Sequence, residues 1–384
     1  MTERDVSAGS FKIRVSGDIA DCEVEWAELE QHGASTPFQT RAWLKPWYAI
    51  AAPYFEATPL VVSVCDRSSG APLMLLPLCA RREGRLRVVE FADGGLSDYN
   101  APLFAKTLTS NKQELDQLWR AIRSSLAGAD ILRLEKQPAV VLGCNNPLVG
   151  LPGMRAMSIA TWGIALPATR ADFDERILGA SFRAQVRKKR RRLAGRGAVR
   201  FVNAANEAEG RKIFSELAAM RESRFEELGR KNVLGEPVLR EFYEAVIFGD
   251  WGKQFAALSA LEVDGEAVAA LFALRRANAY LLVMSSFKAG PWKSSSPGNV
   301  AIDFMVSQLI ETGVSYFDFT IGNETYKSDF GAVATPLYAG VQSLSIGGWP
   351  LAVKQSLKGI VRDSAAAPFA RRAVAMARRA LRAG

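Results

Sequence analysis

Acidic and phenolic side chains gather in two short stretches of the chain. One stretch runs from 318 to 327 with the sequence DFTIGNETYK, and the other is the run SDYN at 97–100, which follows a pair of glycines. A carboxylate placed within hydrogen-bond reach removes a proton from a nucleophile such as an amine, and a phenol returns a proton to a leaving group. The candidate catalytic residues are therefore Asp98, Tyr99, Asp318, Glu324 and Tyr326.

Three of these candidates also have an interpretation that needs no substrate. An acid in the middle of a strand, as expected for Asp318, is costly to bury alone. It either lines a cleft as a base or accepts hydrogen bonds from neighbouring backbone and from Lys327. Tyr326 either protonates a leaving group or packs as an aromatic side chain. Asp98 either faces a cleft as a base or closes an Asx turn in its glycine-rich loop.

A serine-rich loop before a strongly periodic helix is the best candidate for binding an anion. Residues 293–299 have the sequence KSSSPGN, and the apolar positions that follow from Ile302 have helical spacing. The first N–H groups of a helix lack intrahelical acceptors and favour phosphate. An ordinary serine-capped helix start has the same pattern. The candidate ligand-binding residues are Lys293, Ser296, Gly298, Asn299 and Lys327.

Other residues narrow the chemistry further. His32 is the single histidine, and Cys22, Cys65, Cys79 and Cys144 show no CxxC spacing. We therefore expect no metal site, no Ser–His–Asp triad and no disulfide framework. Arg221 and Arg224, three residues apart on one predicted helix, bind a carboxylate or phosphate or else form a solvated face.

Hydrophobic periodicity predicts two α/β units with a similar order of elements. In the first, strands are predicted at 11–15, 59–65, 72–80, 86–91, 131–134 and 156–166, and helices at 24–31, 41–51 and 112–126. In the second, strands are predicted at 199–202, 255–263, 267–275, 279–286, 317–321 and 338–346, and helices at 208–228, 237–248 and from about 300. The expected domains are 11–166 and 167–347, followed by a tail at 348–384.

This order of elements resembles the GNAT acyltransferase fold, and two copies in one chain resemble the Fem-type and CelD-like acyltransferases. The residues that carry the resemblance are Ser296-Pro297-Gly298, the stretch from Asp318 to Lys327, which is similar to the CelD-like signature DF-x-x-G-x-E-x-YK, and the run at 97–100. The resemblance implies an α/β (α+β) fold of two tandem GNAT-like domains with mixed, mostly antiparallel sheets. It also implies acyl-CoA as co-substrate without a tightly bound cofactor, with the coenzyme A pyrophosphate at the turn containing Gly298.

Positive charge is concentrated in the tail and in one internal run. The chain carries a formal net charge of +9, of which +7 lies in the residues from Trp349 to the end. On a helical wheel from Phe369, an apolar arc faces an arc of arginines, namely Arg371, Arg372, Arg378, Arg379 and Arg382. Such a basic amphipathic helix is typical of binding to an anionic membrane surface, although an Ala-rich helix also packs on its own domain. The run of six basic residues at 187–192 indicates a solvated helix or a polyanionic partner.

The sequence thus predicts an N-acyltransferase that moves a fatty acyl group from acyl-CoA to the amine of a lipid, such as a sphingoid base. Bacterial ceramide synthases are the member type that these features favour. The polar N-terminus without an apolar signal core predicts a cytoplasmic enzyme, held peripherally on the inner face of the membrane. Two alternatives stay open. One is a CelD-like or Fem-like transferase acting on a polysaccharide or peptidoglycan precursor, with tRNA as its only nucleic-acid partner, and the other is a non-catalytic binding protein.

Overall fold

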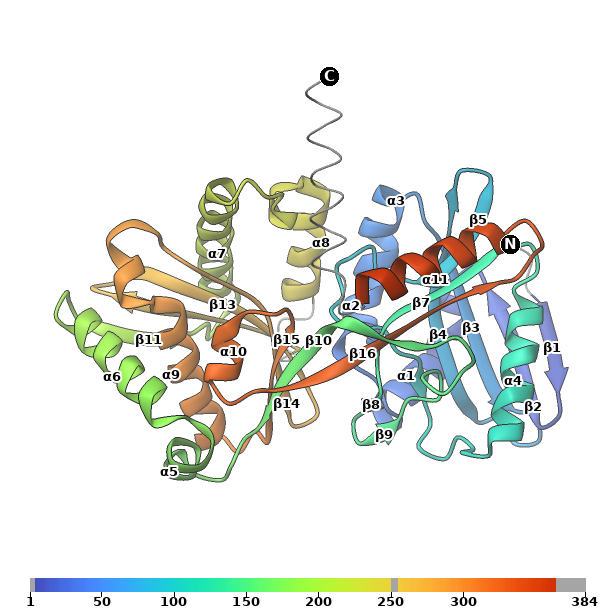
Figure 1. Cartoon of the computed structure of the whole chain (residues 1–384), viewed down its shortest axis with the longest axis horizontal. Helices are drawn as coiled ribbons and strands as arrows, with labels where there is room; N and C mark the ends of the chain where they lie inside the picture. Colours follow the sequence, from blue (N-terminus) through green and yellow to red (C-terminus); the bar gives the residue numbers. More distant parts are fainter. Residues whose placement is uncertain (1–3, 250–254, 364–384) are drawn as a thin grey trace, which may run out of the picture. The chain divides into compact units, whose positions relative to one another are not determined.

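The computed structural model describes residues 4–249 and 255–363, which divide into two compact units (Figure 1). Within the described residues, unit 1 consists of 4–44, 52–160 and 336–363, and unit 2 consists of 45–51 and 161–335. The sequence instead places the boundary near 166 and assigns 336–347 to the second domain. The difference arises because each unit's sheet includes a strand from beyond that boundary.

The sheet of unit 1 contains a path of seven strands in sequence order and one short strand beside it, and the last strand of the path comes from a distant part of the chain. Its order is β1 (Arg4–Ala8), β2 (Phe11–Ser16), β3 (Thr58–Asp66), β4 (Pro72–Glu83), β5 (Leu86–Phe91), β7 (Ile131–Pro138) and β16 (Val333–Ser343), with β6 (Leu103–Phe104) beside β4. Only β5 and β7 pair in parallel; the other neighbours in this path are antiparallel. A small ribbon of β8 (Val140–Val141) and β9 (Cys144–Asn145) follows β7.

The helices of unit 1 pack on this sheet through apolar positions at helical spacing. They are η1 (Ile19–Cys22), α1 (Glu23–His32), η2 (Pro37–Gln39), α2 (Arg41–Pro46), α3 (Ala52–Tyr54), α4 (Lys112–Ser125) and α11 (Trp349–Asp363). In α4, Leu118, Trp119 and Ile122 recur at helical spacing and are buried. The predicted helix at 41–51 is not one α-helix: α2 ends at Pro46, and a π-helical turn η3 (Trp47–Ala51) follows.

The sheet of unit 2 has six strands and carries the candidate site. Its order is β10 (Arg155–Ala165), β15 (Tyr316–Ile321), β14 (Ala279–Phe287), β13 (Glu266–Arg276), β12 (Ala256–Val263) and β11 (Val199–Asn203). Only β14 and β15 run in parallel, so the predicted mixed, mostly antiparallel sheets are confirmed. At the Asp264-Gly265 hairpin between β12 and β13 both residues have positive φ, 51° and 82°, as a type I′ turn requires.

Helices cover both faces of the unit 2 sheet. α7 (Glu207–Glu227) and α8 (Pro237–Phe248) lie on one face, and α6 (Ala180–Ala194) and α9 (Pro297–Glu311) lie on the other (Figure 1). Tyr243 of α8 packs edge-on against Phe272, whereas Met305 and Val306 of α9 pack with Leu271, the neighbouring residue of β13. The shorter elements are α5 (Arg170–Asp172), η4 (Phe173–Ile177), η5 (Val233–Gly235), η7 (Gly290–Ser295) and α10 (Thr325–Asp329).

The predicted amphipathic tail lies mostly outside the described residues, which end at 363. The described part of the tail includes α11, where Ala352 packs with Val88 and Ile131 of unit 1. No helix in the described part of the chain is both long enough and apolar enough to span a membrane.

Candidate functional site

The two parallel strands of unit 2 pair at one end and separate at the other. β14 pairs with β15 only over Ala279–Leu281, opposite Tyr316–Asp318. The hydroxyl of Thr320 donates to the carbonyl of Leu282 at 3.1 Å, and no described strand pairs with this edge of β14 beyond that point. We call this opening the β14–β15 split. It leaves backbone N–H and C=O groups of β14 available to an extended ligand.

Asp318 creates the split by fixing a bend in β15. Its side chain is buried at 7% exposure, and its Oδ1 accepts hydrogen bonds from the backbone N of Thr320 at 2.7 Å and from Oγ1 of Thr161 at 3.1 Å. Thr320 has φ = 59°, a left-handed conformation that is uncommon for a β-branched residue and turns the strand away from β14. Asp318 is therefore a buried acceptor for neighbouring backbone, as in its second interpretation, whereas Lys327 donates to backbone carbonyls and not to Asp318 as that interpretation expected.

Lys327 closes the end of the same strand from inside the protein. Its side chain is 3% exposed, and Nζ donates to the carbonyls of Ile321 at 2.8 Å and Thr320 at 3.4 Å. Nζ also lies 3.1 Å from Oε2 of Glu324, whose side chain is 56% exposed. Gly322 has φ = 136°, and a Cβ there would lie 2.2 Å from Glu324 Oε2. The amine of Lys327 thus points at the strand end, although the sequence suggested a phosphate.

Tyr326 bridges the β14–β15 split from α10. Its ring packs edge-on against Phe319 of β15 with centroids 5.8 Å apart, and the Ser285 side chain of β14 lies beside its hydroxyl. Burial, together with the charge of Glu324, raises the pKa of Tyr326 to about 12. The phenol is therefore neutral near pH 7 and holds a proton that it can donate.

The loop before α9 leaves the N-terminus of the helix open. Ser296 occupies the N-cap position with φ = 44° and makes no side-chain capping hydrogen bond, so the serine-capped interpretation does not describe this helix. In unit 1, by contrast, Asn111 caps α4 by accepting from the backbone N of Gln113. The hydroxyl of Ser295 is fully buried and, among the described residues, has no hydrogen-bond partner. Both observations indicate a place for an anionic ligand.

The other loop residues surround this open N-terminus. Lys293 is exposed, whereas Gly298 and Asn299 are half-buried. A Cβ at Gly298 would lie 3.2 Å from Cδ1 of Phe287, the last residue of β14. The loop and the mouth of the β14–β15 split are therefore adjacent.

Cations of α6 lie beside the same loop, which the sequence analysis did not foresee. Nζ of Lys189 donates to the carbonyl of Ser294 at 2.8 Å, and Nη1 of Arg192 donates to the same oxygen at 3.2 Å. The guanidinium of Arg196 stacks over the ring of Trp292 at 5.1 Å. The run 187–192 is thus a helix, as predicted, but part of its charge is directed at the loop rather than at bulk solvent.

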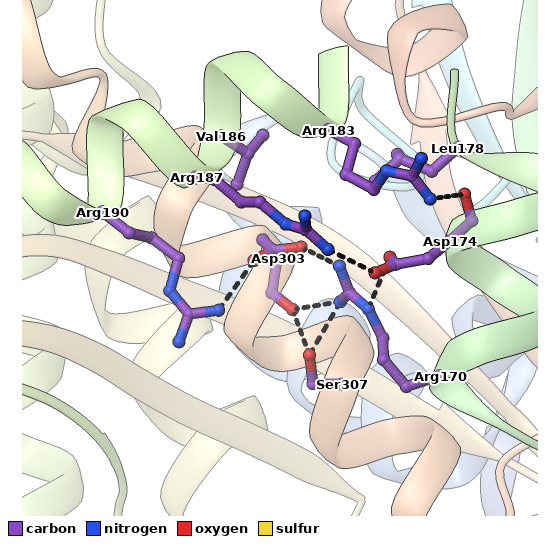
Figure 2. A pocket seen from close by; sticks show the side chains of 9 residues that line it. All are labelled: Arg170, Asp174, Leu178, Arg183, Val186, Arg187, Arg190, Asp303 and Ser307. Atoms are coloured by element: carbon purple, nitrogen blue, oxygen red, sulfur yellow. Dashed lines mark hydrogen bonds and ion pairs between the residues drawn. The ribbon is translucent and has the colours of Figure 1, made fainter. Parts of the chain in front are cut away.

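A pocket of about 200 Å³ lined by arginines lies between α6 and α9, and ion pairs in it link the two helices (Figure 2). Asp303, 1% exposed, receives Nη2 of Arg170 at 2.6 Å and Nη1 of Arg190 at 3.4 Å. Asp174 receives Nε of Arg170 at 2.9 Å and lies 3.7 Å from Nη2 of Arg187. Both carboxylates of the pocket are occupied by arginines, so this network places α6 along α9 and its cations beside the loop.

The glycine-rich loop of unit 1 is an ordered turn around Asp93. Oδ1 of Asp93 accepts from the backbone N of Ser97 at 3.0 Å, and Oδ2 lies 2.6 Å from Nζ of Lys136. Tyr99 is 4% exposed and packs edge-on against Phe38, with ring centroids 5.6 Å apart. Asp98 is half-buried. Tyr99 is thus a core aromatic of unit 1, and the role of Asp98 as a base stays a prediction.

Within residues 4–249 and 255–363 no group of three or more His, Cys, Asp or Glu side chains could hold a metal ion. The site residues that lie together in unit 2 therefore offer acid–base groups, backbone donors and cations. This set is sufficient for transfer of an acyl group, which needs a donor for the developing oxyanion and a proton for the leaving group.

Comparison with known proteins agrees with this chemistry. The family model of the acetyltransferase (GNAT) domain matches residues 180–328. This segment is similar to the GNAT acetyltransferase domain. It includes the open loop, α9, the β14–β15 split and the stretch from Asp318 to Lys327. The predicted class of enzyme, an acyltransferase of GNAT type, is thereby confirmed.

Solved structures show the same fold at low sequence identity. FemX is 11% identical over 93% of this chain and 100% of its own, with a TM-score of 0.58. The C-terminal domain of a protein assigned as a lysylphosphatidylglycerol synthetase from Agrobacterium fabrum is 12% identical over 90% of this chain and 97% of its own, with a TM-score of 0.50. A protein of unknown function from Bacteroides thetaiotaomicron is 12% identical over 89% of this chain and 99% of its own, with a TM-score of 0.50. A search of curated proteins gives no match to the sequence.

These likenesses agree with the repeated order of elements in the two units and support the predicted tandem GNAT-like fold. Thr161, Thr320 and Ser285, which shape the split, were missed from the sequence. No sequence pattern predicts that Thr320, inside a strand, has a left-handed backbone conformation. Thr161 could not be linked to Asp318 because the two residues are 157 positions apart in the sequence.

Proposed function

We propose that the protein is an acyl-CoA-dependent N-acyltransferase whose donor lies in unit 2. The observation that carries the proposal is the uncapped N-terminus of α9 next to the open edge of β14. The pyrophosphate of the donor binds at the loop 293–299, with Lys189 and Arg192 nearby, and the extended pantetheine arm lies along β14 in the split. Gly298 lets the phosphates approach the backbone.

In the reaction, the acceptor amine attacks the thioester carbonyl, a C–N bond forms and the C–S bond breaks. A backbone N–H on the open edge of β14 stabilises the oxyanion of the tetrahedral intermediate. Tyr326 gives its proton to the departing thiolate, since its pKa of about 12 keeps it protonated. The proton released by the amine goes to a carboxylate, for which Asp98 and Glu324 are the candidates.

The acceptor that the sequence favours is an amine-bearing lipid, with a sphingoid base as the specific example. Support comes from the basic amphipathic pattern of the tail from Phe369 onward, which lies outside the described residues, and from the name of one fold neighbour, a lysylphosphatidylglycerol synthetase. On this proposal the enzyme works peripherally at the cytoplasmic face of an anionic membrane, where each basic residue contributes about 1 kcal/mol to binding.

A second candidate is a Fem-like or CelD-like transferase that uses an aminoacyl-tRNA and acts on an envelope precursor. The observation that favours it is the row of cations on α6 beside the loop, because phosphates of an RNA backbone bind to such a row.

A thermal-shift screen of the full chain with acetyl-CoA, palmitoyl-CoA and tRNA separates these candidates. A donor present at a hundred times its Kd stabilises the native state by roughly 2.7 kcal/mol. Stabilisation by an acyl-CoA supports the first proposal, and the chain length of the better ligand indicates the acyl group. Stabilisation by tRNA alone supports the second, and stabilisation by none of the three leaves a binding protein on the same fold.

A further inference from the structure

Two arginines on α7 carry positive charge without a counter-ion in the described part of the chain. The guanidinium of Arg221 lies over the ring of Phe225 at 4.9 Å, and that of Arg224 lies over the ring of Phe287 at 4.7 Å. Among the described residues, neither arginine has an ion-pair partner within 4 Å, and the Nε of Arg221 is buried without a hydrogen-bond partner. Arg211, near the N-terminal end of the same helix, forms an ion pair with Glu207 at 2.6 Å.

This arrangement is unfavourable for the protein without a ligand. Burial lowers the pKa of Arg221, and the like charge of Arg224 lowers it further, whereas Tyr243 of α8 acts in the opposite direction. An unpaired charge out of water is costly, and a guanidinium donates two parallel hydrogen bonds to a carboxylate or phosphate. The pair therefore has the chemistry of an oxyanion site whose ligand is not among the described residues.

The position of the pair relates it to the β14–β15 split. Phe287, under the guanidinium of Arg224, is the last residue of β14, and the charge of Arg224 acts on the phenol of Tyr326. Arg221 lies on α7 near Tyr243, on the face of the sheet opposite α9 and its open N-terminus (Figure 1). Phe287 also lies next to Gly298 of the donor loop, so the pair is near the donor as well as the split. Because the loop already has Lys189 and Arg192 beside it for the donor phosphates, an anion at Arg221 is assigned to the other substrate.

We infer that Arg221 and Arg224 bind a carboxylate or phosphate carried by the acyl acceptor. The inference rests on the proposed function and narrows it. The acceptor is then an amine that also bears an acid group, such as an amino acid or the phosphoethanolamine group of a lipid. A sphingoid base, which has no acid group, would leave the two arginines unpaired.

The test compares amines that differ only in the acid group, with acyl-CoA held saturating. Phosphoethanolamine is paired with ethanolamine and glycine with glycinamide, and sphinganine is included. We expect the anionic member of a pair to have the higher kcat/KM. Arg221→Met and Arg224→Met should each lower its kcat/KM about 10- to 100-fold, mainly through KM, as expected when a charge-assisted hydrogen bond is lost. The kcat/KM for the neutral amine should not change in either variant. Arg211→Met, on the same helix, is the matched control and should change neither.

Stability provides an independent readout. Because Arg221 has no partner in the described chain, Arg221→Met should raise the midpoint of thermal unfolding or leave it unchanged while anion binding is lost. Calorimetric titration with inorganic phosphate and phosphoethanolamine tests the anion site even if no amine of the panel is acylated. Wild-type protein should bind them and Arg221→Met should not.

Three outcomes would overturn the inference. The first is a preference for the neutral amines that the arginine variants leave unchanged, and the second is wild-type protein that binds neither anionic probe. The third is a loss of acyl-CoA affinity in Arg221→Met and Arg224→Met, which would assign the arginines to the donor phosphates. Failure of the proposed function is distinct from all three, because it appears as absence of acyl-CoA binding in the wild-type protein.

Discussion

Replacing Lys327 by methionine distinguishes a structural lysine from a phosphate-binding one. In the structure its amine donates to the carbonyls of Ile321 and Thr320 at 2.8 and 3.4 Å and pairs with Glu324. Hydrogen bonds that involve a charged group contribute about 1.5–3 kcal/mol each, and a half-exposed ion pair adds less than about 1 kcal/mol. Since the longer of the two bonds is weak, we expect a loss of about 3 kcal/mol, with the Thr320 carbonyl left buried and unpaired.

The assay is thermal unfolding of the purified variants alongside calorimetric titration with an acyl-CoA. A loss of about 3 kcal/mol lowers Tm by roughly 6–12 °C for a domain of this size. Lys293→Met is the matched control: its side chain is exposed on the loop, so its stability should change by no more than about 0.5 kcal/mol while donor affinity falls. A Lys327→Met protein with the wild-type Tm and a donor affinity as weak as that of Lys293→Met would refute the structural role.

Three further predictions concern catalysis and membrane binding. Tyr326→Phe should lower kcat by about 10²–10⁴-fold with little change in donor affinity. Because the pKa of Tyr326 is raised to about 12, ionisation of this phenol should not lower the wild-type kcat up to about pH 10. If Glu324 or Asp98 is the base, Glu324→Gln or Asp98→Asn should lose about 10²–10⁴-fold in kcat at unchanged donor affinity; near-normal turnover in both variants would place the base elsewhere. Truncation after Asp363 should release the protein from anionic liposomes, while turnover of a soluble amine persists; equal pelleting of full-length and truncated protein would contradict the membrane proposal.

Much of the fold is predictable because it depends on local periodicity. Most strands of both units and the helices α4, α7, α8 and α9 were placed from alternating or helical apolar patterns to within about five residues. The strands β1, β6, β8 and β9 were not predicted. The partners of β10 and β16 could not be placed this way. Their pairings join segments more than 150 residues apart, and nothing in the local pattern says which strand lies beside them.

The candidate site was predictable in its residues but less so in their roles. The stretch from Asp318 to Lys327 and the loop before α9 do lie together, as expected of a strand and a helix that follow one another in an α/β unit. The roles depend on details that spacing does not contain. Asp318 accepts from a threonine with φ = 59°, and the buried amine of Lys327 turns inward. Arg221 and Arg224 were noted as a pair, but only the three-dimensional structure shows them without a described counter-ion.

Donor binding at the loop before α9 is the central claim, and calorimetric titration of acyl-CoA into wild-type protein and Gly298→Val tests it most directly. A Cβ at Gly298 would lie 3.2 Å from Phe287, and the branched side chain would stand where the phosphates approach the backbone. We expect the wild-type protein to bind acyl-CoA and the folded variant to bind it at least tenfold more weakly, a difference of about 1.4 kcal/mol. Equal affinity of the two folded proteins, or no binding by the wild type, would contradict the assignment of this loop to the donor.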